Sequence, residues 1–113
     1  MKIALSGAHS QGKTTLLNSF VKQKYGQSFV RVPSPTRILS SEGFKINESG
    51  DANTQSMIMV QHFKNVITYD SFSIFDRCAL DGLAYSLFFE DKLRECNLLN
   101  LVQELFISTI HRY

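Results

Sequence analysis

Residues 7–14 read G-A-H-S-Q-G-K-T, the pattern G-x-x-x-x-G-K-[ST], and this octapeptide constrains the fold more than any other part of the chain. A short apolar run at 3–5 precedes it, and apolar residues recur at helical spacing from 16 to 21. A phosphate-binding loop needs this order of strand, loop and helix, so the context argues against a chance match. We therefore predict a strand over 2–6, a phosphate-binding loop and a helix over 14–24.

Each residue type in the loop suits a bound nucleotide phosphate. Gly7 and Gly12 permit backbone angles that turn N–H groups toward the β- and γ-phosphates. Lys13 adds a positive charge, the Thr14 hydroxyl is a Mg²⁺ ligand, and the following helix directs the positive end of its dipole at the same anion. We assign cofactor binding to the loop and the residue after it, namely Gly7, Ala8, His9, Ser10, Gln11, Gly12, Lys13, Thr14 and Thr15.

Length and composition indicate one ordinary domain over 1–113. The formal net charge of +2 leaves no basic stripe for nucleic acid. No apolar stretch reaches the length of a membrane span or a signal peptide, so we expect a cytoplasmic protein, in the host cytoplasm if it is viral. Cys78 and Cys96 are isolated, and we interpret both as small buried apolar groups in a reducing compartment. His9, His62 and His111 are too scattered to form a structural metal site.

Strands and helices alternate along the rest of the chain. We predict further strands over 29–32 and 72–75, and helices over 36–41, 51–68, 80–88 and from 94 onward. Asp51 or Asn53 suits the N-cap of the long helix. The alternation predicts an α/β fold, with a parallel sheet of about three strands flanked by helices.

Apolar spacing also predicts which helix faces are buried. In the long helix, Met59, Phe63 and Ile67 share one face, with Val60 nearby. The two later helices are predicted to bury faces made of Leu80, Leu83, Ala84, Leu87 and Phe88, and of Leu98, Leu101, Val102, Leu105 and Phe106.

An acidic and a basic residue follow the third predicted strand. Asp76 stands where ligands of open α/β sheets bind, and there it would hold Mg²⁺; the alternative is an N-cap for the next helix. The Arg77 guanidinium suits contact with a phosphate group, either one that it binds or the one that is being transferred. The alternative is that Arg77 is a charge on the protein surface. Hydrolytic motors usually carry Glu in place of Arg77, so the sequence favours transfer over hydrolysis.

The loop together with residues 76–85, D-R-C-A-L-D-G-L-A-Y, resembles the phosphate-loop kinases of the thymidylate kinase and deoxynucleoside kinase group. More narrowly, it is similar to the AAA-type ATPase-like family that includes the ribosylnicotinamide kinase domain of NadR proteins and members encoded by bacteriophages. The resemblance implies that Lys13 and Thr14 hold ATP·Mg²⁺, that Asp76 serves the metal or the acceptor, and that Arg77 contacts acceptor phosphate. Lys13, Asp76 and Arg77 are then the catalytic residues, and Thr14 and Asp76 the metal ligands.

Further acceptor residues follow from the same resemblance. Members of this group often carry the pattern E-x-x-R after the second strand. Arg37 matches the arginine of this pattern and is a candidate acceptor-binding residue, whereas the glutamate is absent here. Asp81 and Tyr85 lie one helical turn apart and either face the acceptor pocket or lie on the solvent side. Three polar residues of the long helix either point toward an acceptor base or form a solvated face. These three are Gln55, Gln61 and His62.

Complete members of the resembled group have more than three strands, in the order 2-3-1-4-5, and an arginine-bearing lid. The late strands and the lid are missing here, so the first strand is expected at an open edge. The chain is then a C-terminally truncated fragment, or a shortened protein whose edge a partner, a second copy or its own last helix covers. We expect ATP- and Mg²⁺-dependent phosphoryl transfer to a small nucleoside, nucleoside monophosphate or related metabolite. The alternatives are a nucleotide-binding ATPase or regulatory protein, and a non-catalytic ATP-binding interaction protein.

Overall fold

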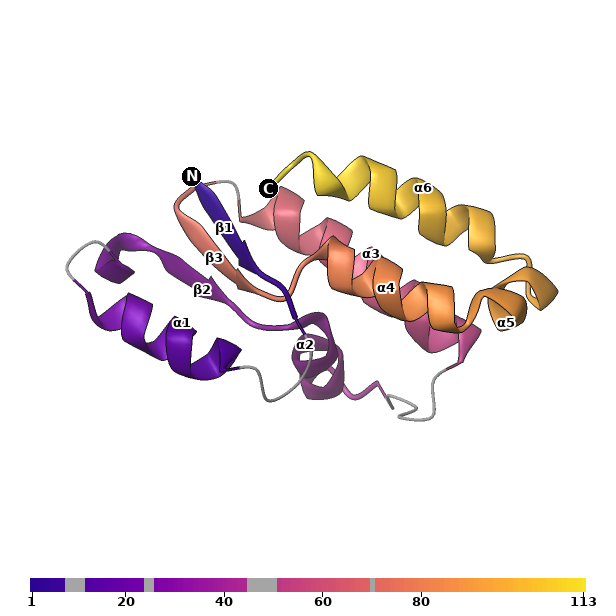
Figure 1. Cartoon of the computed structure of the whole chain (residues 1–113), viewed down its shortest axis with the longest axis horizontal. Helices are drawn as coiled ribbons and strands as arrows, with labels where there is room; N and C mark the ends of the chain where they lie inside the picture. Colours follow the sequence, from indigo (N-terminus) through magenta and orange to yellow (C-terminus); the bar gives the residue numbers. More distant parts are fainter. Residues whose placement is uncertain (8–11, 24–25, 45–50, 70) are drawn as a thin grey trace.

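The computed structural model describes residues 1–7, 12–23, 26–44, 51–69 and 71–113. The elements follow the predicted alternation (Figure 1). They are β1 (Lys2–Leu5), α1 (Lys13–Lys22), the 3₁₀ turn η1 (Gly26–Ser28), β2 (Val30–Val32), α2 (Pro35–Ser41), α3 (Ala52–Thr68), β3 (Ser73–Asp76), α4 (Ala79–Phe88), α5 (Glu90–Glu95) and α6 (Leu99–Ile110).

The three strands form a parallel sheet with the order β1-β3-β2. β3 lies in the middle and is buried along its whole length. Leu5 pairs with Asp76, and Val32 pairs with Phe75, so the carboxyl ends of all three strands meet at one edge. The α/β fold with a parallel sheet is therefore confirmed, and the loops that leave this edge carry the predicted site.

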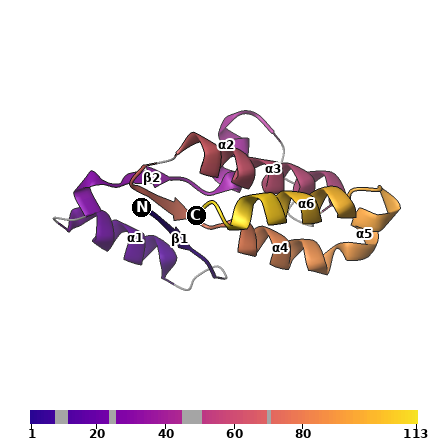
Figure 2. The same ribbon diagram turned by 90° about the horizontal axis from the view of Figure 1, so that it is seen from above.

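Helices cover both faces of the sheet. Val66 of α3 packs with Val32 and Phe75 on one face. Helix α1 contacts β3, and Figure 2 shows α1 and α3 on opposite sides of the strands. Helices α3, α4 and α6 also pack on one another, around a second core made of Ala52, Met59, Ala79, Leu93 and Val102.

The predicted first strand lies at an edge of the sheet. Among the residues that the structure describes, β1 pairs with β3 alone. The main contacts of α6 are with α3 and α4, so the last helix packs within the helical layer and not along this edge. Within the described ranges, no helix is both long enough and apolar enough to cross a membrane.

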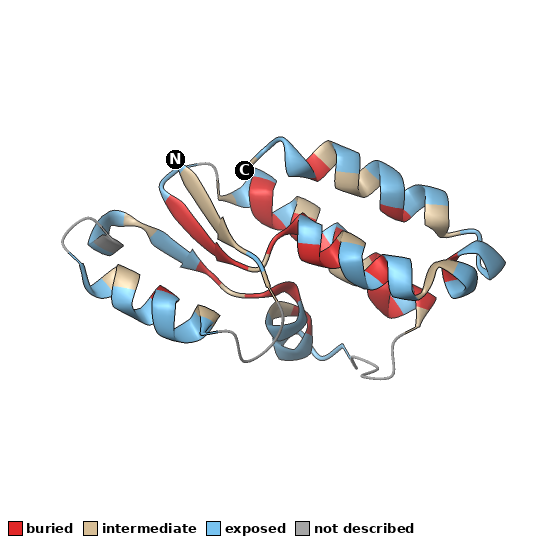
Figure 3. Ribbon diagram, viewed as in Figure 1, coloured by how far each residue is buried: buried red, intermediate tan, exposed pale blue. Residues whose placement is uncertain are grey.

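The predicted apolar faces are partly wrong. Figure 3 shows buried and exposed residues alternating along the helices. Ile67 is 49 % exposed on α3, and Phe88 is 86 % exposed on α4. Small or polar residues are buried on these two helices instead, and a small residue is favoured at Gly82 of α4 because Met59 and His62 of α3 lie against it. Among them are Gln55, His62 and Asn65 on α3 and Ala79, Gly82 and Ser86 on α4.

Two other expectations also need correction. The helix predicted from 94 onward begins only at Leu99, and the preceding residues Glu90–Glu95 form the separate helix α5, because Asn97 takes a left-handed conformation with φ of +57° between them. Cys78 is buried as predicted, whereas Cys96 is exposed, because it follows the end of the short helix α5. The Asp51 cap is confirmed: its carboxylate accepts from the Thr54 N–H at 2.7 Å.

Tyr113 joins the end of the chain to the loop after β3. Its ring packs edge-on against Phe75, with centroids 5.2 Å apart, and its hydroxyl accepts from the Ala79 N–H at 2.9 Å. Burial raises the pKa of the Tyr113 phenol, so the hydroxyl stays neutral. Near the same end of the chain, Lys2 Nζ donates to the carbonyls of Val66 and Arg112. The Tyr113 hydroxyl therefore binds the first turn of α4, and Lys2 joins the start of the chain to its end.

Candidate functional site

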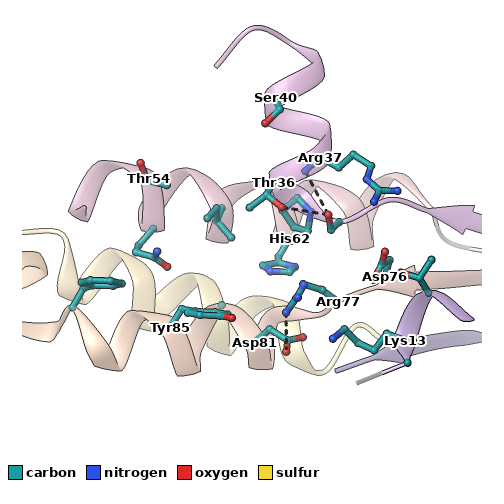
Figure 4. A pocket seen from close by; sticks show the side chains of 18 of the residues that line it. Lys13, Thr36, Arg37, Ser40, Thr54, His62, Asp76, Arg77, Asp81 and Tyr85 are labelled. Atoms are coloured by element: carbon teal, nitrogen blue, oxygen red, sulfur yellow. Dashed lines mark hydrogen bonds and ion pairs between the residues drawn. The ribbon is translucent and has the colours of Figure 1, made fainter. Parts of the chain in front are cut away.

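A cleft of about 1230 Å³ lies at the carboxyl edge of the sheet. Figure 4 shows Lys13 and Asp76 at one end and Thr54 and Tyr85 at the other, with His62 between the two ends. The described residues that line it are Gly12, Lys13, Thr14, Thr15, Ser34, Pro35, Thr36, Arg37, Ser40, Thr54, Gln55, Ile58, His62, Asp76, Arg77, Asp81, Gly82, Tyr85 and Phe89.

The phosphate-binding loop enters this cleft at the start of α1. Gly7 has φ of +143° and Gly12 has φ of +81°, and Gly12 is the N-cap of α1. No side-chain oxygen caps this helix in the described residues, so its first N–H groups suit an anion. Ala8, His9, Ser10 and Gln11 lie outside the described residues.

Lys13 is half-buried and belongs to the first turn of α1. Its ammonium donates to the Gly7 carbonyl at 2.7 Å. Thr14 and Thr15, the next two residues, also line the cleft. The structure therefore brings the predicted cation and hydroxyl groups together at one end of the cleft.

Asp76 ends β3 and is only 8 % exposed. It does not cap the next helix: the N-cap of α4 is Cys78, in a capping box with Asp81. The interpretation of Asp76 as an N-cap is therefore wrong. Asp76 and Thr14 both line the cleft, and Asp76 lies at the same end as Lys13, the residue before Thr14 (Figure 4), so their oxygens suit a hard cation such as Mg²⁺ bound with a phosphate.

Arg77 turns back toward the phosphate-binding loop. Its side chain is 14 % exposed, and Nη1 donates to the Gly7 carbonyl at 3.0 Å. The same nitrogen lies 3.9 Å from Asp81 Oδ1. The alternative that Arg77 is a surface charge is therefore wrong.

Asp81 and Tyr85 both line the cleft from α4. Asp81 is 7 % exposed, so a solvent-side position is wrong for this residue, whereas the Tyr85 ring is 41 % exposed. The Asp81 carboxylate accepts hydrogen bonds from Ser6, Gly7 and Cys78. It thus contacts the phosphate-binding loop directly.

Helix α3 forms the opposite wall of the cleft. Gln55 and His62 are buried and line it, so the interpretation as a solvated face is wrong. Gln61 is also buried, but its amide donates to Asn65 and it does not line the cleft. The Gln55 Oε1 atom is buried with no hydrogen-bond partner among the described residues.

His62 is kept neutral by its position in this wall. Burial lowers its pKa to about 4, the nearby Asp81 carboxylate opposes this shift, and the Arg77 guanidinium adds to it. The imidazole therefore adds no positive charge to the cleft near neutral pH.

Arg37 lies on α2, across the cleft from Lys13 (Figure 4). Ser34, which replaces the acid of the resembled pattern, is the N-cap of α2 and its hydroxyl accepts from the Arg37 N–H at 3.4 Å. Arg37 is exposed within the cleft, where its charge is accessible to a ligand.

Comparison with protein families identifies what this arrangement belongs to. The family model described as AAA domain matches residues 2–106. The chain is a member of the AAA domain family. No curated protein and no solved structure matched it. The match supports a nucleotide-binding, ATP-binding phosphate-loop domain, in agreement with the parallel sheet and the loop at 7–14.

Sequence reasoning missed several residues of the cleft in this AAA domain. Ser34, Thr54, Ile58, Gly82 and Phe89 line it as well. A signal for two of them was present, because 54, 55, 58 and 62 share one face of a helix and include three polar residues. Gly82 lacked such a signal, since its role depends on contact with α3.

The described part of this AAA domain holds no group of three His, Cys, Asp or Glu side chains that could bind a metal ion together. A cation at Asp76 and Thr14 would therefore share its coordination with nucleotide phosphate and water, as Mg²⁺ usually does.

Proposed function

We propose that this AAA domain transfers the γ-phosphoryl group of ATP to a small nucleoside, nucleoside monophosphate or related metabolite, as the resembled kinase group does. This proposal is supported mainly by the fact that a single cleft joins the phosphate-binding end to a second, opposite end. The cleft extends from Lys13 and Asp76 to Gln55 and Tyr85 and has a volume of about 1230 Å³. A site for one small ligand spans roughly 300–1,000 Å³, so there is room for an acceptor beside the nucleotide phosphates.

The residues at the phosphate end suit phosphoryl transfer by positioning and charge neutralisation. Bound Mg²⁺ would offset the charge of the phosphates, and the oxygens of Thr14 and Asp76 would hold it. Lys13 and Arg77 both reach the Gly7 carbonyl, so two positive charges lie beside the loop. If the acceptor is a hydroxyl group, the Asp76 carboxylate would also take its proton.

The other end of the cleft suits a planar acceptor group. Tyr85 of α4 and Phe89, which follows this helix, offer aromatic surface, and Gln55 lines the cleft from α3. Flat aromatic groups pack well on aromatic side chains, so an acceptor with a planar ring, such as a nucleobase, would be favoured there.

The direct test is a panel of nucleosides, nucleoside monophosphates and nicotinamide riboside, each added with ATP and Mg²⁺. We expect one acceptor class to raise ADP release above the rate without acceptor, and its phosphorylated product to appear by mass spectrometry. ADP release that no acceptor stimulates would support the ATPase or regulatory alternative. ATP binding without any ADP release would support a non-catalytic interaction protein.

Asp76→Asn is expected to lower Mg²⁺-dependent turnover at least about tenfold, because it removes a charge at the metal end of the cleft. The amide keeps the size of the side chain, so the melting temperature should change little. ADP release measured against Mg²⁺ concentration checks this. Asp91→Asn, an exposed position on α5, is the matched control. Unchanged metal dependence in Asp76→Asn would rule out the metal role.

Arg37→Ala is expected to weaken the binding of a phosphorylated acceptor while ATP affinity stays nearly constant. Arg77→Ala is expected to weaken acceptor binding and ATP binding together, because it also removes a hydrogen bond to the Gly7 carbonyl of the phosphate-binding loop. A guanidinium–phosphate contact contributes roughly 1.5–3 kcal/mol, so the loss is about ten- to a hundredfold in acceptor KM or transfer rate. Lysine at either position should restore little of the lost acceptor binding, because an ammonium group lacks the planar, two-pronged geometry of a guanidinium group. Arg31→Ala, exposed and outside the cleft, is the control. A loss of ATP affinity without an acceptor effect would assign both arginines to the donor end.

A further inference from the structure

Asp81 contacts the phosphate-binding loop at its first peptide. Oδ1 accepts from the Gly7 N–H and from the Ser6 hydroxyl, both at 3.0 Å. Oδ2 accepts from the Cys78 N–H, also at 3.0 Å. A buried carboxylate needs such partners, and three donors provide them. Its hydrogen bonds are therefore directed at the protein and not at the open part of the cleft.

The same carboxylate also lies beside Arg77. Nη1 of Arg77 is 3.9 Å from Asp81 Oδ1 and donates to the Gly7 carbonyl. Both backbone polar groups of Gly7 are thus bound, its N–H by Asp81 and its carbonyl by Arg77 and Lys13. Arg77 has φ of +77°, a conformation that residues other than glycine rarely adopt, and such a conformation persists where surrounding contacts hold it.

We propose that Asp81 is a positioning residue that joins α4 to the phosphate-binding loop and sets the geometry in which the loop and Arg77 meet nucleotide phosphate. Because Asp81 lies on α4, its contact also connects the phosphate-binding loop with the acceptor end of the cleft. Tyr85 follows one turn later and lines the acceptor end, so one helix contacts both ends of the cleft. This inference rests on nucleotide binding alone and does not depend on phosphoryl transfer.

The test measures the affinity of the full chain for the non-hydrolysable analogue AMP-PNP with Mg²⁺, by calorimetry well below each melting temperature. Asp81→Asn keeps the size of the side chain but removes its charge and one acceptor oxygen. We expect about tenfold weaker binding, the scale of a lost charge-assisted hydrogen bond.

Ser86→Ala is the matched control, because Ser86 lies on the same helix, is buried and donates to the Gly82 carbonyl without contacting the loop. Ser86→Ala should lower the melting temperature and leave AMP-PNP affinity unchanged. If the role of Asp81 were purely structural, Asp81→Asn would give this same result. Equal affinity in Asp81→Asn and the parent overturns the proposal.

If Asp81→Asn does not fold, Ser6→Ala takes its place, because it removes a single donor to Oδ1. We expect about threefold weaker AMP-PNP binding, and an unchanged affinity overturns the proposal. A parent chain that binds AMP-PNP but phosphorylates no acceptor refutes the kinase function and leaves this inference standing. A parent chain that does not bind AMP-PNP refutes both.

Discussion

Lys13→Ala is expected to lower nucleotide-dependent turnover by about 10²- to 10³-fold, the usual effect of removing a preorganised charge at a transferring phosphate. Lys13 is half-buried at the start of α1 and reaches the Gly7 carbonyl, and it lies outside the two apolar cores. The fold should therefore persist. ATP affinity and ADP release measure the loss, and thermal unfolding checks the fold.

Lys22→Ala provides the control for this prediction. Lys22 is an exposed residue in the last turn of the same helix, so the net charge changes equally while the phosphate end is untouched. Equal nucleotide affinity and turnover in Lys13→Ala and the parent would contradict the role of the loop.

Acidification is expected to destabilise the protein by up to about 3 kcal/mol between pH 6.5 and pH 4 through His62 alone. Burial lowers the pKa of His62 from 6.5 to about 4 in the folded protein, so the unfolded chain takes up the proton first. The stabilisation is complete above pH 6.5 and is lost as the pH falls toward 4. Asp81 and Arg77 face the imidazole, and their charges oppose and assist this shift, respectively.

Urea unfolding at pH 7 and pH 4.5 tests the contribution of His62. His62→Asn should have a smaller difference between the two pH values than the parent, whatever its stability at pH 7. His111→Asn changes an exposed histidine at the end of α6 and should keep the difference of the parent. The same difference in His62→Asn and the parent would show that His62 is not the group that takes up the proton.

Much of this architecture follows from local sequence signals. The loop at 7–14 specifies its own strand and helix, because a phosphate site needs glycines at fixed places. Asp51 marks the start of α3 through a hydrogen bond within one turn. Asp76 follows an apolar run, and parallel strands bring such ends together. Each of these signals involves residues close in sequence, so the chain alone predicts them.

The buried faces and the partners of Asp81 depend on contacts between distant segments. Phe88 is apolar yet exposed, while Gly82 and Ser86 are buried where α4 approaches α3. Hydrophobic spacing assigns the large residues to the core and cannot detect a contact made by small ones. The Asp81 carboxylate accepts a hydrogen bond from the Gly7 N–H, 74 positions away in sequence, and no local sequence pattern predicts that contact.

The width of the cleft depends on one missing methyl group. A Cβ atom at Gly82 would lie 3.0 Å from Met59 Cε and 3.1 Å from His62 Cδ2, closer than ordinary van der Waals contact. An alanine at this position would require the Met59 methyl group or the His62 ring to move by a few tenths of an ångström, and a longer side chain would need more room between α4 and α3. A side chain at position 82 is therefore expected to reduce the room for a ligand in the cleft beside His62.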